Sequence, residues 1–154
     1  MLNDLSVDPK DGTVYFSAMD TNKIYMLKDC KVELWKENMN KPNGLLVDGE
    51  LLLVASFGEG TLKAYNKNTN ELVGQYADGL GKADGVVKLN FGNYMVSDWR
   101  GEIFLVEKDK TTSLYNSMEE KTQTADIGII PGQDVVLIPT FFGNRVKAYR
   151  FTEE

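Results

Sequence analysis

The stretch Lys82-Ala83-Asp84-Gly85-Val86-Val87 decides the fold of this chain, because its pattern of a polar residue followed by apolar ones recurs three more times. The counterparts are Asn3-Asp4-Leu5-Ser6-Val7, Asn43-Gly44-Leu45-Leu46-Val47 and Asp126-Ile127-Gly128-Ile129-Ile130. The leading polar residues stand at positions 3, 43, 84 and 126, which are 40, 41 and 42 residues apart. A period near forty residues is typical of repeat architectures, so the sequence predicts four copies of one structural unit.

A second shared block follows each of these stretches and has the composition of a β-strand. The four blocks are Val14–Met19, Leu52–Phe57, Tyr94–Trp99 and Val136–Phe141. Turn signals such as Asp48-Gly49 and Arg100-Gly101 separate them from further short runs of β-branched and aromatic residues. No stretch shows sustained helical periodicity. Four short strands in each unit are typical of a β-propeller blade, so we expect an all-β fold.

The units are expected to form a single partial β-propeller domain, with blades at residues 1–40, 41–81, 82–123 and 124–154. The pattern predicts about four four-stranded blades, but the last unit ends after its third strand, near Phe151. An open arc of this kind leaves bare faces and an unpaired strand edge at its ends, and such surfaces favour association with another chain. The sequence therefore predicts a homo-oligomer, most simply a two-fold dimer, unless missing N-terminal blades are supplied separately.

Composition argues against several classes of partner and mechanism. The formal charge of −6 comes without a basic stripe, so neither nucleic acid nor a membrane surface is an expected partner. The start of the chain shows no signal peptide, and the repeat pattern indicates that this start is truncated, which leaves the compartment open. The absence of histidine excludes serine–histidine and cysteine–histidine catalysis. The single cysteine, Cys30, is expected to be an exposed thiol in a turn.

The repeated polar position has a functional interpretation. In a propeller, the innermost strands of all blades begin at one mouth of the central channel, so equivalent residues face one another. We therefore expect Asn3, Asn43, Asp84 and Asp126 to converge. Their amide and carboxylate oxygens suit a hard divalent cation, calcium or magnesium. The alternative is turn chemistry, because Asn-Gly and Asp-Gly are common tight-turn dipeptides.

The turn between the second and third strands of each unit is expected to lie at the same mouth. The equivalent residues there are Met19, Phe57, Trp99 and Phe141. An apolar wall with a few polar groups suits a small-molecule ligand, so the expected substrate pocket consists of Asp98, Trp99, Arg100 and Phe141. The alternative is that these large side chains only pack one blade against the next.

Several phrases of the sequence also resemble a known family. The phrases are Asn3-Asp4-Leu5-Ser6-Val7-Asp8, Pro42-Asn43-Gly44-Leu45, Ala83-Asp84-Gly85-Val86 and Val96-Ser97-Asp98-Trp99. In this order they are similar to the later blades of the senescence marker protein, gluconolactonase and luciferin-regenerating enzyme family, and NHL-type propellers share the strand pattern. The resemblance covers essentially the whole chain. It implies a six-bladed propeller, of which this chain matches the C-terminal two-thirds.

The resemblance also implies a site. In that family, two asparagines and an aspartate at the positions of Asn3, Asn43 and Asp84 ligate a divalent metal, and the aspartate is the proposed catalytic base. The family's glutamate ligand and its substrate contacts come from early blades that are not encoded here. We therefore expect a fragment of a divalent-metal-binding, lactonase-type hydrolase that is inactive alone. The alternative is a non-enzymatic propeller that binds a ligand or a protein.

Overall fold

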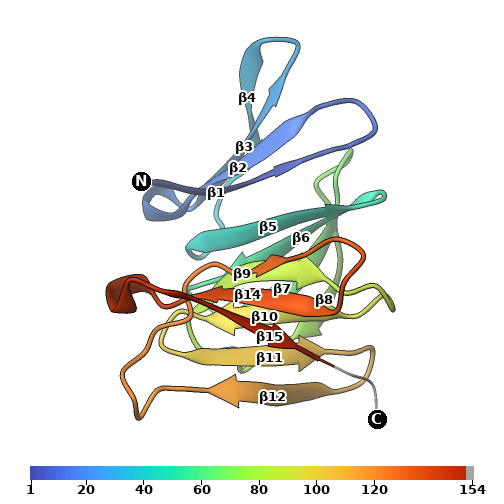
Figure 1. Cartoon of the computed structure of the whole chain (residues 1–154). Helices are drawn as coiled ribbons and strands as arrows, with labels where there is room; N and C mark the ends of the chain where they lie inside the picture. The colour runs from blue at the N-terminus through green and yellow to red at the C-terminus, as the bar shows by residue number, and fades with distance from the viewer. Residues whose placement is uncertain (152–154) are drawn as a thin grey trace.

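The computed structural model describes residues 1–151, which consist mostly of β-strands (Figure 1). They form four antiparallel sheets, each with its strands in chain order. Blade 1 contains β1 (Leu2–Val7), β2 (Val14–Ala18), β3 (Lys23–Lys28) and β4 (Lys31–Lys36). Blade 2 contains β5 (Pro42–Asp48), β6 (Leu51–Ser56), β7 (Thr61–Asn66) and β8 (Leu72–Ala77). Blade 3 contains β9 (Ala83–Lys88), β10 (Tyr94–Asp98), β11 (Glu102–Val106) and β12 (Thr111–Asn116). Blade 4 contains β13 (Gly128–Ile129), β14 (Val135–Pro139) and β15 (Val146–Arg150).

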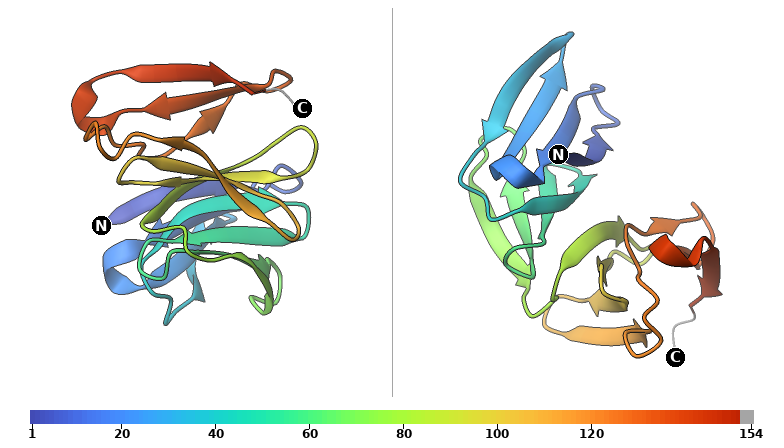
Figure 2. Two further views of the ribbon diagram at one scale, coloured as in Figure 1. Left: turned by 90° about the horizontal axis from the view of Figure 1, so that it is seen from below. Right: turned by 90° about the vertical axis from the view of Figure 1, so that its left-hand side faces the viewer.

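The blades follow one another around a common axis as an open arc. The inner strand β1 lies against β5, β5 lies against β9, and β9 lies against β13. The right-hand view of Figure 2 shows blades 1 and 4 on the two sides of an opening. The partial all-β propeller predicted from the sequence is confirmed, and within residues 1–151 the last blade has three strands. The end of the predicted last blade, residues 152–154, lies outside the described residues.

Irregular structure is confined to short connections. Two 3-10 turns, η1 (Met19–Thr21) and η2 (Phe141–Gly143), follow the second strands of the end blades. Cys30 lies in the β3–β4 turn with a φ of 59° and is exposed, which confirms the predicted turn thiol. Among the residues that the structure describes, no helix has the length and apolar character needed to cross a membrane.

The core lies between the blades, because successive strand residues point to opposite faces of a sheet. Three apolar clusters fill the spaces between consecutive blades. In blade 2, for example, Leu45 and Val54 pack toward blade 1, whereas Leu46 and Leu53 pack toward blade 3. Each blade is therefore held in place mainly by its neighbours.

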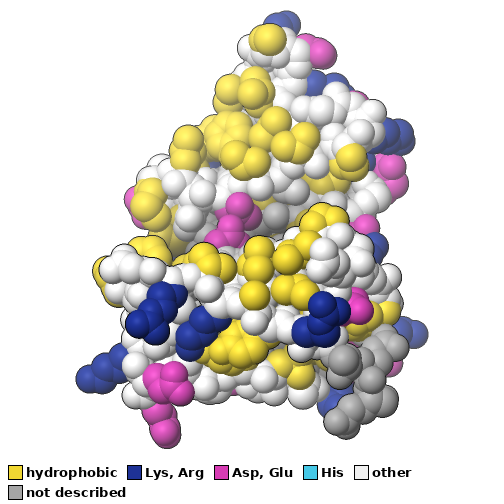
Figure 3. Space-filling model, viewed as in Figure 1, with side chains coloured by type: hydrophobic (Ala, Val, Ile, Leu, Met, Phe, Trp, Pro, Cys, Tyr) yellow, Lys and Arg dark blue, Asp and Glu magenta, His cyan; other side chains and the backbone are white. Residues whose placement is uncertain are grey.

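The two end blades each have one sheet face that no described blade covers. On blade 1 this face is apolar across all four strands, and it consists of Leu5, Val7, Val14, Phe16, Tyr25, Leu27, Val32 and Leu34. On blade 4 it includes Ile130, Leu137, Pro139, Val146 and Ala148. Figure 3 shows both hydrophobic areas, with acidic side chains in the hollow between them. We call these surfaces the blade 1 end face and the blade 4 end face.

Candidate functional site at the mouth of the arc

Asn43 and Asp84 stand near the start of the neighbouring inner strands β5 and β9, and each is followed by a glycine. Neither Gly44 nor Gly85 has a positive φ. A Cβ atom on Gly44 would lie 2.0 Å from the carbonyl oxygen of Asp84, and one on Gly85 would lie 2.1 Å from Oδ1 of Asp126. The glycines thus allow adjacent inner strands to approach closely. The tight-turn interpretation of these two dipeptides is wrong.

Strand pairing shows that Asp126 is offset by one residue from the repeat position predicted for it. In blade 2, Leu45 lies opposite Val54. In blade 4, Gly128 pairs with Leu137, the residue before the counterpart of Val54. Ile127 therefore takes the place of Leu45. Asp126 corresponds to Gly44, and Ala125 holds the position that Asn43 and Asp84 occupy in the inner blades.

Asp4, which sequence reasoning missed, shares this second position with Asp126. Each of the two carboxylates accepts a hydrogen bond from the next amide, at 2.7 Å from Leu5 N and 2.8 Å from Ile127 N. Asp4 Oδ2 also accepts one from Leu45 N at 2.6 Å, which ties blade 1 to blade 2. The available signal was a carboxylate in unit 1 where units 2 and 3 have glycine.

Asn3 is placed differently from Asn43. It is exposed, and its Nδ2 lies 3.8 Å from the sulfur of Met19. The side chain of Asn43 is only 2% exposed, because blade 1 covers one side of β5 and blade 3 covers the other. Being on an end blade, Asn3 lacks the neighbour that buries its counterpart.

The carboxylates at the mouth perturb one another. The pKa of Asp84 is raised to about 7, mainly by burial and next by the Asp126 carboxylate, while the Asn43 side chain acts in the opposite direction. Burial likewise raises the pKa of Asp4 to about 6, although the hydrogen bond from Leu45 opposes this effect. Burial also raises the pKa of Asp126. The mouth therefore holds three acids whose charged forms are disfavoured by desolvation.

Aromatic residues from three blades border the same mouth. The rings of Trp99 and Phe141 meet edge to face with centroids 5.8 Å apart, and Phe142 packs on Phe141 at 4.7 Å. The ammonium group of Lys82 lies 5.1 Å from the centre of the Phe57 ring. The turns after β6, β10 and β14 supply these rings, as the repeat predicted.

Asp98 and Arg100 are paired with each other. Asp98 is fully buried, and its carboxylate accepts hydrogen bonds from the backbone N of Arg100 at 2.9 Å and from its Nε at 3.0 Å. The carboxylate also lies so close to Gly81 that a Cβ atom there would be 1.9 Å from Oδ2. This pair thus supports the loop that leads into β9, and its predicted contact with a substrate stays a prediction.

The chemistry of the donors at the mouth fits a hard cation. Oδ1 of Asn43 is buried without a hydrogen-bond partner within residues 1–151, and it lies beside the desolvated carboxylate of Asp84. A divalent cation would satisfy the orphaned oxygen and offset the repulsion among the acids. The fit is incomplete, because no three Asp, Glu, His or Cys side chains of the described part are close enough to hold a metal.

These features define a class of protein, an open-arc β-propeller with an acidic, aromatic-rimmed mouth. A scan against models of protein families finds no match, and no curated protein sequence matches either. Solved structures do match. A gluconolactonase from Xanthomonas campestris superposes with a TM-score of 0.82 at 13% identity, covering 99% of this chain and 59% of that one.

Two further solved structures are similar over nearly the whole chain. A luciferin-regenerating enzyme matches with a TM-score of 0.69 at 18% identity, over 90% of this chain and 53% of that one. Virginiamycin B lyase from Staphylococcus aureus matches with a TM-score of 0.75 at 11% identity, over 99% and 56%. The structural neighbours thus include a gluconolactonase and a luciferin-regenerating enzyme, two of the proteins named by the sequence resemblance. This chain spans a little over half of their length, and at these identities the likeness concerns the fold.

Proposed function

We propose that this chain carries the metal-binding face and the catalytic base of a lactonase-type hydrolase. Asn43 and Asp84 are the proposed central ligands of a calcium or magnesium ion, with Asp126 and the end-blade residue Asn3 completing the predicted set. The observation that carries the proposal is the buried Oδ1 of Asn43, which has no hydrogen-bond partner in the described part of the chain and lies beside the Asp84 carboxylate. The fold shared with a gluconolactonase supports it.

Asp84 has the properties of a general base. In the metal-free protein this carboxyl has a pKa of about 7, and a bound cation would hold it ionised and ready to accept a proton from an attacking water. The neighbouring Asn43 side chain favours the ionised form of this carboxylate. When bound, the cation would polarise the lactone carbonyl as a Lewis acid. Trp99 and Phe141 would contact the apolar part of the substrate.

Metal binding is tested by calorimetric titration of the metal-free protein with calcium and with magnesium. We expect weak binding, because the set of ligands on this chain is incomplete, and we expect Asp84→Asn to abolish it. The matched control is Asp109→Asn, which removes the same charge from an exposed hairpin turn at the opposite end of the blades. Equal binding by both variants, or no heat at millimolar metal, would count against the site.

The chain alone is expected not to hydrolyse lactones. A hydrolase needs its cation, base and substrate contacts held together in working geometry, and this chain supplies only part of them. Assay of δ-gluconolactone hydrolysis with saturating calcium should therefore give the uncatalysed rate. Turnover that disappears in Asp84→Asn would contradict the expected inactivity while supporting the proposed base.

A further inference from the structure

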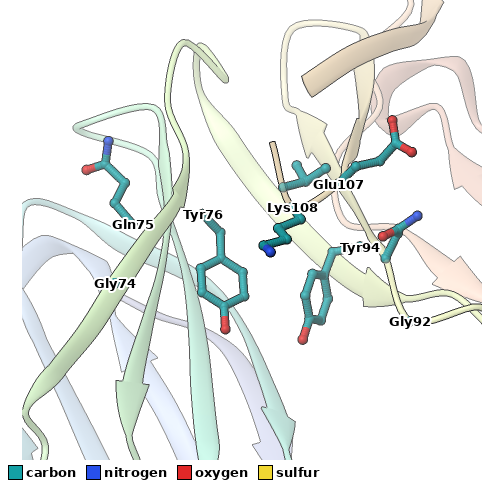
Figure 4. A pocket seen from close by; sticks show the side chains of 9 residues that line it. Gly74, Gln75, Tyr76, Gly92, Tyr94, Glu107 and Lys108 are labelled. Carbon is teal, nitrogen blue, oxygen red and sulfur yellow. The ribbon is translucent and has the colours of Figure 1, made fainter. Parts of the chain in front are cut away.

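A cavity lies between blades 2 and 3, at the end of the strands remote from the mouth. It has a volume of about 470 Å³ and is formed by β8, by the β9–β10 turn and by the end of β11 (Figure 4). Its lining residues include Gly74 and Tyr76 from blade 2, and Tyr94, Val106 and Lys108 from blade 3. Neither the repeat position at the mouth nor the predicted substrate pocket includes any of these residues.

Two positions beside the cavity hold smaller residues than their counterparts in other blades. Strand pairing makes Val106 of blade 3 equivalent to Tyr65 of blade 2 and Tyr149 of blade 4. Their partners on the preceding strand are Tyr94, Leu52 and Val136. A valine thus stands where both neighbouring interfaces have a tyrosine ring. Gly74 lies opposite Ala64, and the equivalent residue of blade 1 is Glu33, which lies opposite Met26. Glycine thus stands where blade 1 has a glutamate.

Gly74 lies next to a register shift between β7 and β8, but within residues 1–151 no close contact excludes a side chain there. Its φ is not positive, and a Cβ atom there would meet only the Tyr76 ring, at an ordinary contact distance of 4.0 Å. Glycine in the interior of a strand weakens the strand, and it often marks a place where a ligand approaches closely. Gly74 leaves open space beside the strand that a ligand could occupy.

Tyr76 and Tyr94 form an aromatic corner. Their ring centroids are 5.9 Å apart with a tilt of 48°. The hydroxyl of Tyr94 donates a hydrogen bond to Oδ2 of Asp48 at 2.6 Å, and Oδ1 of that carboxylate pairs with Lys88 at 2.7 Å. The ring of Tyr94 is thus held in one orientation. The two tyrosine rings therefore offer two apolar surfaces to a flat ligand.

Lys108 supplies the charge of the cavity. In Figure 4 its side chain reaches toward the two phenol rings, whereas Glu107 points away from them. Lys108 makes no ion pair with any residue in the described range 1–151. The corresponding groove between blades 1 and 2 differs, because its Lys67 is buried against Asp8 and its Lys28 pairs with Asp11.

We propose that the cavity between blades 2 and 3 binds a small aromatic carboxylate, with its ring in the corner of Tyr76 and Tyr94 and its carboxylate on Lys108. Gly74 and Val106 leave the room that the ring needs. The site is independent of the proposed cation at the mouth, which lies at the other end of the strands.

The test is titration of ¹⁵N-labelled protein with 1-naphthoate, followed by amide chemical shifts. We expect saturable shifts at Gly74, Gly92 and Tyr94, and none at Asn43 and Gly85. Lys108→Gln should weaken binding roughly three- to tenfold, as expected for loss of one charged partner, and Lys110→Gln should leave it unchanged. The neutral analogue 1-naphthylmethanol should bind the wild type as weakly as 1-naphthoate binds Lys108→Gln.

Cavity-filling variants decide whether this space is the site. Gly74→Val suits a strand and should abolish binding while the protein stays folded by circular dichroism. If that variant does not fold, Val106→Tyr restores the residue of the neighbouring blades and should have the same effect on binding. Shifts that persist in a folded filled variant, shifts confined to the end faces, or no saturation at 10 mM ligand (about the weakest affinity worth calling a site) would each overturn the proposal.

Discussion

Leu5 and Leu45 are the same amino acid at the same position of the repeat, yet they have different surroundings. Leu45 belongs to an inner blade and is 4% exposed, whereas Leu5 belongs to an end blade and is 60% exposed. The difference arises because a blade has no core of its own and buries a face only against a neighbour. Blades 2 and 3 have two neighbours each, and blades 1 and 4 have one. Stability and site chemistry should therefore be concentrated in the inner blades.

The largest expected difference between inner and end blades is the loss of unfolding free energy when each leucine is truncated to alanine. Leu45→Ala creates a cavity between blades 1 and 2 and should lower the free energy of unfolding by about 2–5 kcal/mol. Leu5→Ala removes a side chain that is already hydrated, so we expect a loss below roughly 1 kcal/mol. Urea denaturation at nanomolar concentration, where association is negligible, measures both. Equal losses would show that Leu5 is buried in the free chain.

The acids at the mouth should give the next largest effect. The folded-state pKa of Asp84, about 7, lies above its ordinary value of 3.8, so the folded protein retains this proton when the unfolded chain has lost it. The stability of the metal-free protein should therefore fall as the pH rises from about 4 to about 7. Asp84→Asn should remove much of this slope and raise stability at pH 8 by about 1–3 kcal/mol, given about 1.4 kcal/mol per pKa unit.

Urea denaturation in a chelator at pH 5 and at pH 8 tests this sign. The matched variant is Asp109→Asn, which should leave the slope unchanged because Asp109 is exposed. Asp4 should contribute a smaller share, because its pKa of about 6 is nearer to the ordinary value. A wild-type protein more stable at pH 8 than at pH 5 would contradict the desolvated mouth.

The end faces should affect assembly more than folding. We expect the chain to self-associate, with the blade 4 end face of one copy against the blade 1 end face of another, because every interface inside the chain joins these two kinds of face. Leu5→Lys or Val146→Lys should shift sedimentation at micromolar concentration toward the monomer while changing the free energy of unfolding by less than roughly 0.5 kcal/mol.

The matched control for assembly is Leu114→Lys, because Leu114 is an exposed residue of the outer strand β12 and lies outside both end faces. In a closed two-fold dimer, the blade 4 end face of each copy contacts the blade 1 end face of the other, so both contacts form together. A wild-type monomer at micromolar concentration, or an open-ended polymer that lengthens with concentration, would each contradict it.

The repeat itself could be predicted from the sequence because its signals are local. Strand alternation, turn residues and the forty-residue period depend on neighbours along the chain, and they indicated the blades, the three strands seen in blade 4 within residues 1–151 and the turn around Cys30. The positions of Asn43 and Asp84 near the start of inner strands could be predicted in the same way, since each precedes a glycine and an apolar run. The offset of Asp126 could not, because it depends on the pairing of β13 with β14.

By itself, the sequence determined that this protein is a four-unit β-propeller arc with a set of oxygen donors near the start of its inner strands. Tertiary structure decided which of those donors are buried, that Asp4 joins them while Asn3 stays exposed, and why Gly44 and Gly85 are needed. It also decided that a cavity lies between blades 2 and 3. The physical reason is that burial and desolvation depend on the neighbouring blade, forty residues away in the chain, and no local pattern records that contact.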